Sequence, residues 1–79
     1  MDNMTSLTNQ EKKRILEQEI RRINSEMYPI EVRGRIAGKL NDMNLKNQCL
    51  SELERLQKYL DEYGLELKHL SPQPAKKGD

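Results

Sequence analysis

Two glycines one helical turn apart, Gly34 and Gly38, lie in the segment of this chain whose residue types could bind a ligand. Three cations surround them: Arg33, Arg35 and Lys39. Glycine-rich backbone with flanking cations can hold phosphate, but a P-loop also needs a preceding strand and a following Lys-Ser/Thr. This segment has neither, so we predict no nucleotide site and no cofactor. With Ala37, the glycines predict either a hinge or a strip of small residues. A helix of this chain or of a second copy could approach such a strip closely.

The other reactive side chains predict no catalytic or metal site. His69 is the single histidine and Cys49 the single cysteine, whereas a zinc site needs several nitrogen or sulfur ligands. Cys49 falls at a core position of a helical pattern, where a free cysteine behaves as a small hydrophobic residue. Carboxylates alternate with Lys and Arg, which is typical of a solvated helix surface. We therefore predict that the protein is not an enzyme and holds no metal.

The cations around the glycines could contact a macromolecule instead. We predict a patch that binds another protein through acidic groups, made of Arg33, Arg35 and Lys39. The alternative is a DNA- or RNA-binding regulator that contacts phosphates through a wider cluster: Arg21, Arg22, Arg33, Arg35 and Lys39. A helix–turn–helix over residues 35–53 fits poorly, because Asn41 replaces the usual turn glycine and the following helix is acidic and rich in leucine.

Size and composition limit what the chain can do alone. It has 79 residues, of which 34% are hydrophobic, and a net charge of +1 from 14 basic and 13 acidic side chains. Such a charge gives no general attraction to nucleic acid or to anionic membranes. A single small domain with so few apolar residues has a marginal core, so we predict a homo-oligomer, a dimer or a tetramer. Neither a membrane span nor a secretory signal is recognisable, so we expect a cytoplasmic protein.

The first predicted element is an amphipathic helix over residues 9–27. Thr8 and Glu11 have the spacing of a capping box, in which each side chain accepts a hydrogen bond from the other residue's backbone. An apolar stripe of isoleucine, leucine and methionine follows. Two charge pairs with i,i+4 spacing are expected on the other faces: Glu17 with Arg21, and Arg22 with Glu26.

Pro29 predicts a break. Proline disfavours a helical residue before it and is well suited to the first turn of a new helix. We therefore expect a bend near Tyr28 and a second helix over residues 30–41. The sequence "NDMN" that follows has turn chemistry, and Asp42 or Asn44 could cap the next helix.

A third helix is expected over residues 45–63, ended by Gly64 as a left-handed C-terminal residue. Its apolar positions are spaced by four and three residues and predict a seam for the core or the oligomer: Cys49, Leu53, Leu56, Leu60 and Tyr63. Residues 65–70 could form an arm that docks on its own subunit or on another. We expect one helical domain over 8–70, a flexible segment at 1–7 and a disordered tail at 71–79.

The stretch "LSELERL", residues 50–56, resembles the SQELD signature of the small helical-hairpin phosphatases that act on sporulation response regulators. Glu54 stands where that signature has aspartate, the leading residues differ, and the segment before the stretch is longer than in that hairpin. No activity is inferred from the resemblance.

These observations together predict an all-α protein of two or three amphipathic helices, arranged as a hairpin or small bundle and assembled as a homo-oligomer. The expected function is that of a small regulatory protein acting by protein–protein interaction. It would be an adaptor, an inhibitor or an antirepressor, of the kind that phages and mobile elements encode. The expected mechanism is occlusion, in which rigid helices cover a surface of the partner protein.

Overall fold

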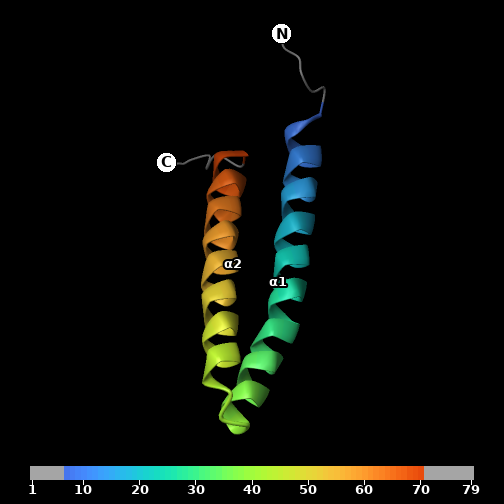
Figure 1. Cartoon of the computed structure of the whole chain (residues 1–79). Helices are drawn as coiled ribbons and strands as arrows, with labels where there is room; N and C mark the ends of the chain where they lie inside the picture. The colour runs from blue at the N-terminus through green and yellow to red at the C-terminus, as the bar shows by residue number, and fades with distance from the viewer. Residues whose placement is uncertain (1–6, 71–79) are drawn as a thin grey trace, which may run out of the picture.

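The chain folds into two long helices that run antiparallel and are joined by a tight turn (Figure 1). This computed structural model describes residues 7–70. Helix α1 spans Asn9–Lys39 and helix α2 spans Met43–Leu70, with no strand in the described residues. The all-α prediction is confirmed, in the form of a two-helix hairpin. The tail predicted at 71–79 lies outside the described residues, as does most of the segment predicted to be flexible at 1–7.

The start of α1 is held by the predicted capping box. Thr8 Oγ1 accepts a hydrogen bond from the Glu11 backbone N–H at 3.1 Å. The Glu11 carboxylate in turn accepts one from the Thr8 N–H at 2.8 Å. Backbone donors that a helix start leaves without partners are satisfied in this way, and the predicted first residue of the helix is confirmed.

Pro29 lies inside α1, so the predicted break before it and the separate helix over 30–41 are wrong. Ile23, Ile30 and Ala37 are spaced by seven residues and are buried or half-buried, so one face packs on both sides of the proline. Pro29 itself is exposed, which keeps its ring out of the contact between the helices. A proline inside a helix removes one backbone donor and crowds the preceding turn, which favours a bend away from the ring. Figure 1 shows the following part of α1 leaning toward α2.

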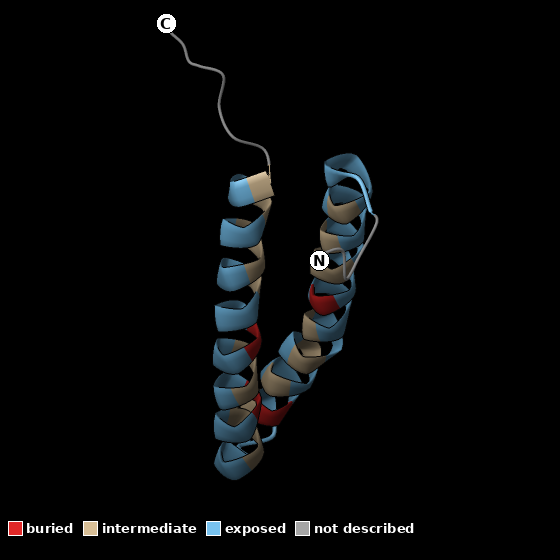
Figure 2. Ribbon diagram, turned by 90° about the horizontal axis from the view of Figure 1, so that it is seen from above, coloured by how far each residue is buried: buried red, intermediate tan, exposed pale blue. Residues whose placement is uncertain are grey.

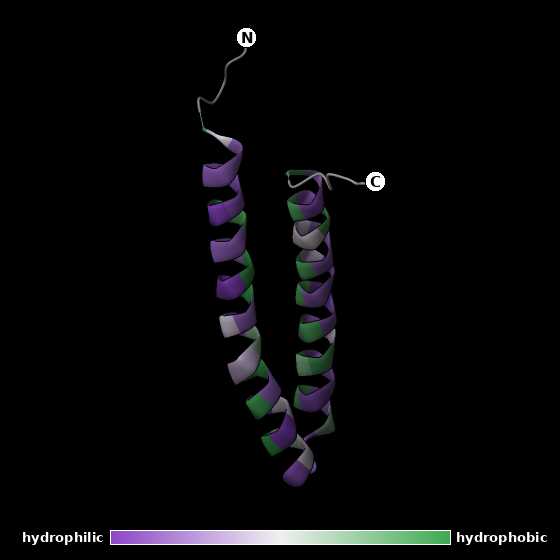
Figure 3. Cartoon of the chain, turned by 180° about the vertical axis from the view of Figure 1, so that it is seen from behind, coloured by the Kyte–Doolittle hydropathy of each residue, from purple (hydrophilic) through white to green (hydrophobic). Residues whose placement is uncertain are grey.

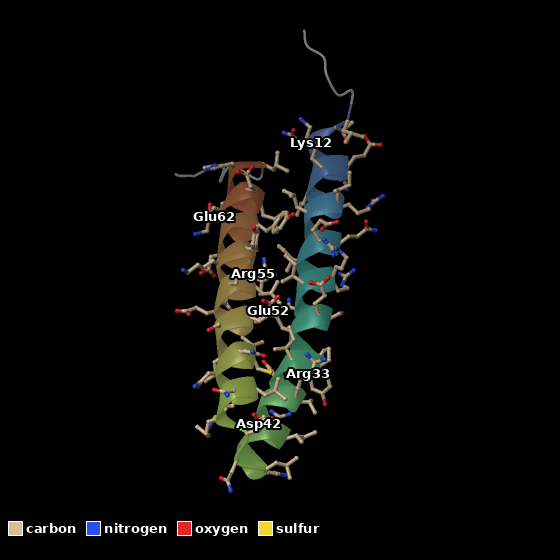
Figure 4. All side chains as sticks on the ribbon, viewed as in Figure 1. Lys12, Arg33, Asp42, Glu52, Arg55 and Glu62 are labelled. Carbon is tan, nitrogen blue, oxygen red and sulfur yellow. The ribbon has the colours of Figure 1, made fainter. Side chains whose placement is uncertain are left out.

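The turn between the helices is a Schellman motif with asparagine in place of the usual glycine. Asn41 has a φ of 60°, in the left-handed region. Its N–H donates to the Gly38 carbonyl at 3.2 Å, and the Asp42 N–H donates to the Ala37 carbonyl at 2.8 Å. Asp42, labelled at the turn in Figure 4, also caps α2, because its Oδ1 accepts from the Leu45 N–H at 3.2 Å. One of the two predicted caps is thereby confirmed.

Helix α2 continues past Gly64 to Leu70, so the predicted helix over 45–63 is too short at both ends and the predicted arm is helical. Leu60 and Leu67 are half-buried and continue the apolar stripe on both sides of the glycine. A glycine inside a helix costs about 1 kcal/mol relative to alanine. Packing of the flanking side chains offsets this cost. Helix propensity does not include such packing, and it therefore predicted an end of the helix at Gly64.

The core of the hairpin is small. Four side chains are buried among the described residues: Ile23, Ala37, Cys49 and Leu56. They occupy the turn end and the middle of the hairpin (Figure 2). The helices are closest at the turn and diverge toward the termini (Figure 1), and hydrophobic residues lie mainly along their facing sides (Figure 3). Neither described helix is long and apolar enough to cross a membrane.

Candidate functional site

The small residues of α1 face α2 of the same chain. A Cβ at Gly34 would lie 3.3 Å from the Cys49 Cβ, so the two backbones approach closely at this point. Ala37 is 2% exposed, and a Cβ at Gly38 would lie 3.6 Å from the Cδ of Lys46. Of the two roles considered from the sequence, the arrangement is that of a close-approach strip within the hairpin, and the helix continues through both glycines.

The predicted seam of α2 faces α1 over its whole length. Cys49 and Leu56 are buried, whereas Leu53, Leu60 and Tyr63 are half-buried. The burial is least complete toward the termini, where the helices diverge (Figure 1). The seam therefore forms the hairpin's own core at the turn end and leaves part of its apolar surface open elsewhere.

An apolar groove with a basic rim lies beside the close-approach strip, and we call it the turn groove. Its volume is about 520 Å³. The lining residues come from both helices: Glu31, Gly34, Arg35, Gly38, Lys39, Lys46, Cys49, Leu50 and Leu53. Within the described residues, Arg35, Lys39 and Lys46 form no ion pair. The groove can therefore attract carboxylates while offering leucine side chains to an apolar group.

Arg33 lies on the other side of the hairpin. It lines a separate groove of about 300 Å³ together with Ile30 and Glu52, and Figure 4 labels Arg33 and Glu52 on the two facing helices. Arg33 and Arg35 are two residues apart, which turns them by about 200° around a helix. The structure thus brings Arg35 and Lys39 together in the turn groove and separates Arg33 from them.

The wider basic cluster considered for nucleic acid is also divided. Arg22 is held by Glu19 at 2.6 Å and Glu26 at 3.1 Å. The hydrogen bond that Arg22 donates to Glu19, with the attraction of both carboxylates, raises the pKa of Arg22 above its ordinary value. Arg21 lines a groove with Glu17 nearer the termini and forms no ion pair within the described part of the chain. The predicted Glu17–Arg21 pair is therefore absent, while the Arg22–Glu26 pair is present.

An exposed stripe on α1 includes Ile36 and Leu40, which the apolar pattern of the helix predicted over 30–41 already contains, and we call it the outer stripe. Pro29, Arg33, Ile36 and Leu40 follow one another at spacings of four, three and four residues. Ile36 is 50% exposed and Leu40 is 73% exposed. That pattern also contains Ala37, which is buried, because neighbouring residues are turned by about 100° around a helix and cannot share one face.

The described residues contain no group of side chains able to hold a metal ion. Cys49 is buried as a free thiol, and His69 is exposed near the end of α2. The Glu52–Arg55 pair is an ordinary i,i+3 pair at 2.7 Å. Its hydrogen bond lowers the pKa of Glu52 and raises that of Arg55. The features that stand out on this hairpin are surfaces, namely the turn groove and the outer stripe.

Comparisons with protein-family models, with curated proteins and with solved structures find no match for this chain.

Proposed function

We propose that this chain is a small, non-enzymatic regulatory protein that acts by protein–protein interaction and assembles as a homo-oligomer, a dimer or a tetramer. The observation that carries the proposal is the disproportion between buried and exposed apolar side chains. Only four described residues are buried, whereas nine large hydrophobic side chains are at least 42% exposed. Apolar surface of this extent is typical of proteins that bury it against a partner.

The outer stripe is the surface of this chain that we propose to bind a partner protein other than a second copy. Its spacing is that of a helix face presented to a groove or to another helix. Ile36 and Leu40 supply the apolar contacts, and Arg33, which has no ion pair in the described region, would attract a carboxylate of the partner. Binding would then cover the partner's own interaction surface, which is the occlusion mechanism expected of an adaptor, an inhibitor or an antirepressor.

A photo-crosslinking experiment tests this surface. Benzoylphenylalanine at Leu40, in the chain expressed in its native host, is expected to cross-link one other protein, and Arg33→Glu is expected to abolish the product. The matched control is the same group at Lys58, an exposed position of α2, where no such product is expected. Equal cross-linking at both positions would show that the outer stripe is not the binding surface.

Light scattering across a dilution series tests the assembly. Each apolar side chain that becomes fully buried stabilises the assembly by about 1.5–3 kcal/mol, so we expect a mass above that of one chain at micromolar concentration and dissociation on dilution. A single-chain mass at every concentration would refute the homo-oligomer.

The alternative function is binding to DNA or RNA. The observation that favours it is that Arg21, Arg35 and Lys39 are exposed and have no ion pairs within the described residues. Arg21 and Arg35 are fourteen residues apart, so they lie on the same side of α1. A gel shift with random duplex at low salt separates the two functions. Strong, salt-sensitive binding that is lost in Arg21→Glu/Arg35→Glu would favour nucleic acid.

A further inference from the structure

One side of α1 carries a stripe of residues in which four charges invert their signs when the stripe is read in the reverse direction. The stripe follows alternating spacings of three and four residues, which keep it on one side of a helix. In order, its members are Arg14, Glu17, Arg21, Asn24, Tyr28, Glu31, Arg35 and Gly38. All but Gly38 are exposed. Glu17 and Arg21 line the groove nearer the termini, and Glu31 and Arg35 line the turn groove, so the stripe borders both grooves.

The stripe is complementary to itself when two copies of α1 run in opposite directions. Pairs centred on residue 26 then match Glu17 with Arg35, and Arg21 with Glu31. At the centre, Asn24 meets Tyr28, which is 63% exposed. Opposite charges at such flanking positions set the partner and the orientation of packed helices. A stripe that ran parallel to its copy in register would instead place each charge opposite its own kind.

The four charges that are matched across the axis, Glu17, Arg21, Glu31 and Arg35, have no ion pair within the described part of the chain, although two i,i+4 combinations are available to them. By contrast, Arg22 and Arg55, on other faces, do form intrachain pairs. These charges alternate in sign beside an apolar groove, so they suit a binding partner that places a charge of opposite sign at each position. A second copy of this chain supplies that order.

We propose that two hairpins associate through this face as an antiparallel dimer, with α1 against the α1 of the second copy and the two-fold axis near residue 26. This inference rests on the homo-oligomer of the proposed function and specifies its interface. The turn groove of each copy then faces the diverging end of the other, where Ile20 and Leu67 line a groove. The result is a four-helix arrangement in which the half-buried apolar residues become core.

An independent feature of α2 agrees with the same axis. Gly34 lies against Cys49 and Gly38 against Lys46, so in these antiparallel helices residue 26 is level with residue 57. Leu50 and Gly64 lie seven residues on either side of residue 57. Leu50 is 54% exposed, and nothing lies within 4 Å of a Cβ at Gly64. The same two-fold axis therefore places the exposed Leu50 of each copy over the partner's Gly64.

A parallel face-to-face dimer is disfavoured by charge. Its axis would run along the hairpin and would place α1 over α2 of the second copy at the same height. Arg35 and Lys39 would then lie close to the partner's Lys46, because all three residues line the turn groove. None of these cations has a carboxylate partner within the described residues, so their repulsion would oppose that arrangement.

Reciprocal charge reversal tests the proposal. The basic reversal is Arg21→Glu/Arg35→Glu and the acidic reversal is Glu17→Lys/Glu31→Lys. Each variant alone replaces every attractive pair across the axis by a repulsive one, so we expect the dimer Kd to rise at least about tenfold. An equimolar mixture of the two variants restores attraction in every pair and is expected to form a heterodimer of near wild-type Kd. A chain carrying all four changes should again form a homodimer.

The outcomes separate this inference from the proposed function. Light scattering gives the mass, and native mass spectrometry of variants with different isotope labels identifies the heterodimer. Lys58→Glu, on an exposed position of α2, is the control for net charge and should leave the Kd unchanged. If the wild-type chain assembles but mixing restores nothing, the proposed interface is wrong and the homo-oligomer stands. A wild-type chain that is monomeric at all concentrations overturns both.

Discussion

Alanine replacement of three helical glycines tests how closely the two helices approach one another. Each replacement gains about 1 kcal/mol of helix propensity, because glycine loses more backbone freedom on folding than alanine. The sites differ only in what the new methyl group meets. At Gly64 nothing lies within 4 Å of a Cβ, at Gly38 the nearest atom is the flexible Lys46 side chain at 3.6 Å, and at Gly34 it is the Cys49 Cβ at 3.3 Å.

The expected stabilities follow from these distances. Gly64→Ala and Gly38→Ala should each raise the free energy of unfolding by about 1 kcal/mol. Gly34→Ala meets an atom fixed to the backbone of α2, and overpacking of this kind costs about 1–3 kcal/mol. The gain in propensity is then cancelled or exceeded, so the variant should be about 0–2 kcal/mol less stable than wild type. A difference of 1 kcal/mol corresponds to about 4–8 °C in Tm for a domain of this size.

Urea and thermal unfolding followed by circular dichroism at 222 nm measure the series. The variants should be compared at a protein concentration at which light scattering gives all of them the mass of one chain, since assembly adds to apparent stability and the proposed dimer places Leu50 of the partner over Gly64. The result that decides is the ranking of the three variants by their free energy of unfolding. If Gly34→Ala stabilises the protein as much as Gly64→Ala does, the helices do not touch at Gly34 and Cys49, and the described crossing is wrong.

Four further changes test other parts of the hairpin. Leu56→Asp places an unpaired charge at a position that is 6% exposed and should cost at least about 3 kcal/mol; unchanged helicity and mass would show that this position is not core. Thr8→Ala removes one half of the capping box and should cost about 1 kcal/mol in a urea titration; the absence of any loss would place the helix start elsewhere. Pro29→Ala restores a backbone donor in an exposed helix interior and should raise Tm, because proline there costs about 3 kcal/mol; a lower Tm would mean that the packing needs the bend. The hydrogen bond from Arg55 lowers the pKa of Glu52, so the contribution of this pair is present above the ordinary glutamate pKa and is lost as the pH falls through the lowered value. An NMR titration should find a higher pKa for Glu52 in Arg55→Met, and an equal pKa would contradict the pairing.

Local signals in the sequence predicted the N-terminal caps of both helices, but not every local charge pair, since Glu17 and Arg21 do not pair within the described residues. The capping box at Thr8 and the cap at Asp42 involve residues three apart. Spacing identified the capping box, whereas it left Asp42 and Asn44 as two candidates for the second cap. The breaks expected at Pro29 and Gly64 failed because tertiary packing decided them. At both points the apolar stripe continues in phase on either side, and its burial against the other helix outweighs the local preference of one residue.

The candidate surfaces also differ in whether local sequence or packing between the helices determines them. The separation of Arg33 from Arg35 follows from the turn per residue of a helix, and could have been stated from the sequence once one helix was accepted. The turn groove could not, because it joins Arg35 on α1 to Lys46 and Leu50 on α2. Which residues of α2 lie beside those of α1 depends on the close approach at Gly34, and no local signal encodes that register.

The turn at Asn41 determines the order in which the contacts between the helices form during folding and separate under force. Contacts beside the turn, such as Gly38 with Lys46, close the shortest loops between the helices and so cost the least chain entropy. Contacts toward the two ends close progressively longer ones. The contacts between the helices should therefore form first beside the turn at Asn41 and then progressively toward the termini. Folding of this kind has a low contact order and is expected to be rapid. A pull applied to both ends would meet little resistance at first and would separate the helices until it reached Ile23 and Leu56, the first buried side chains on that path.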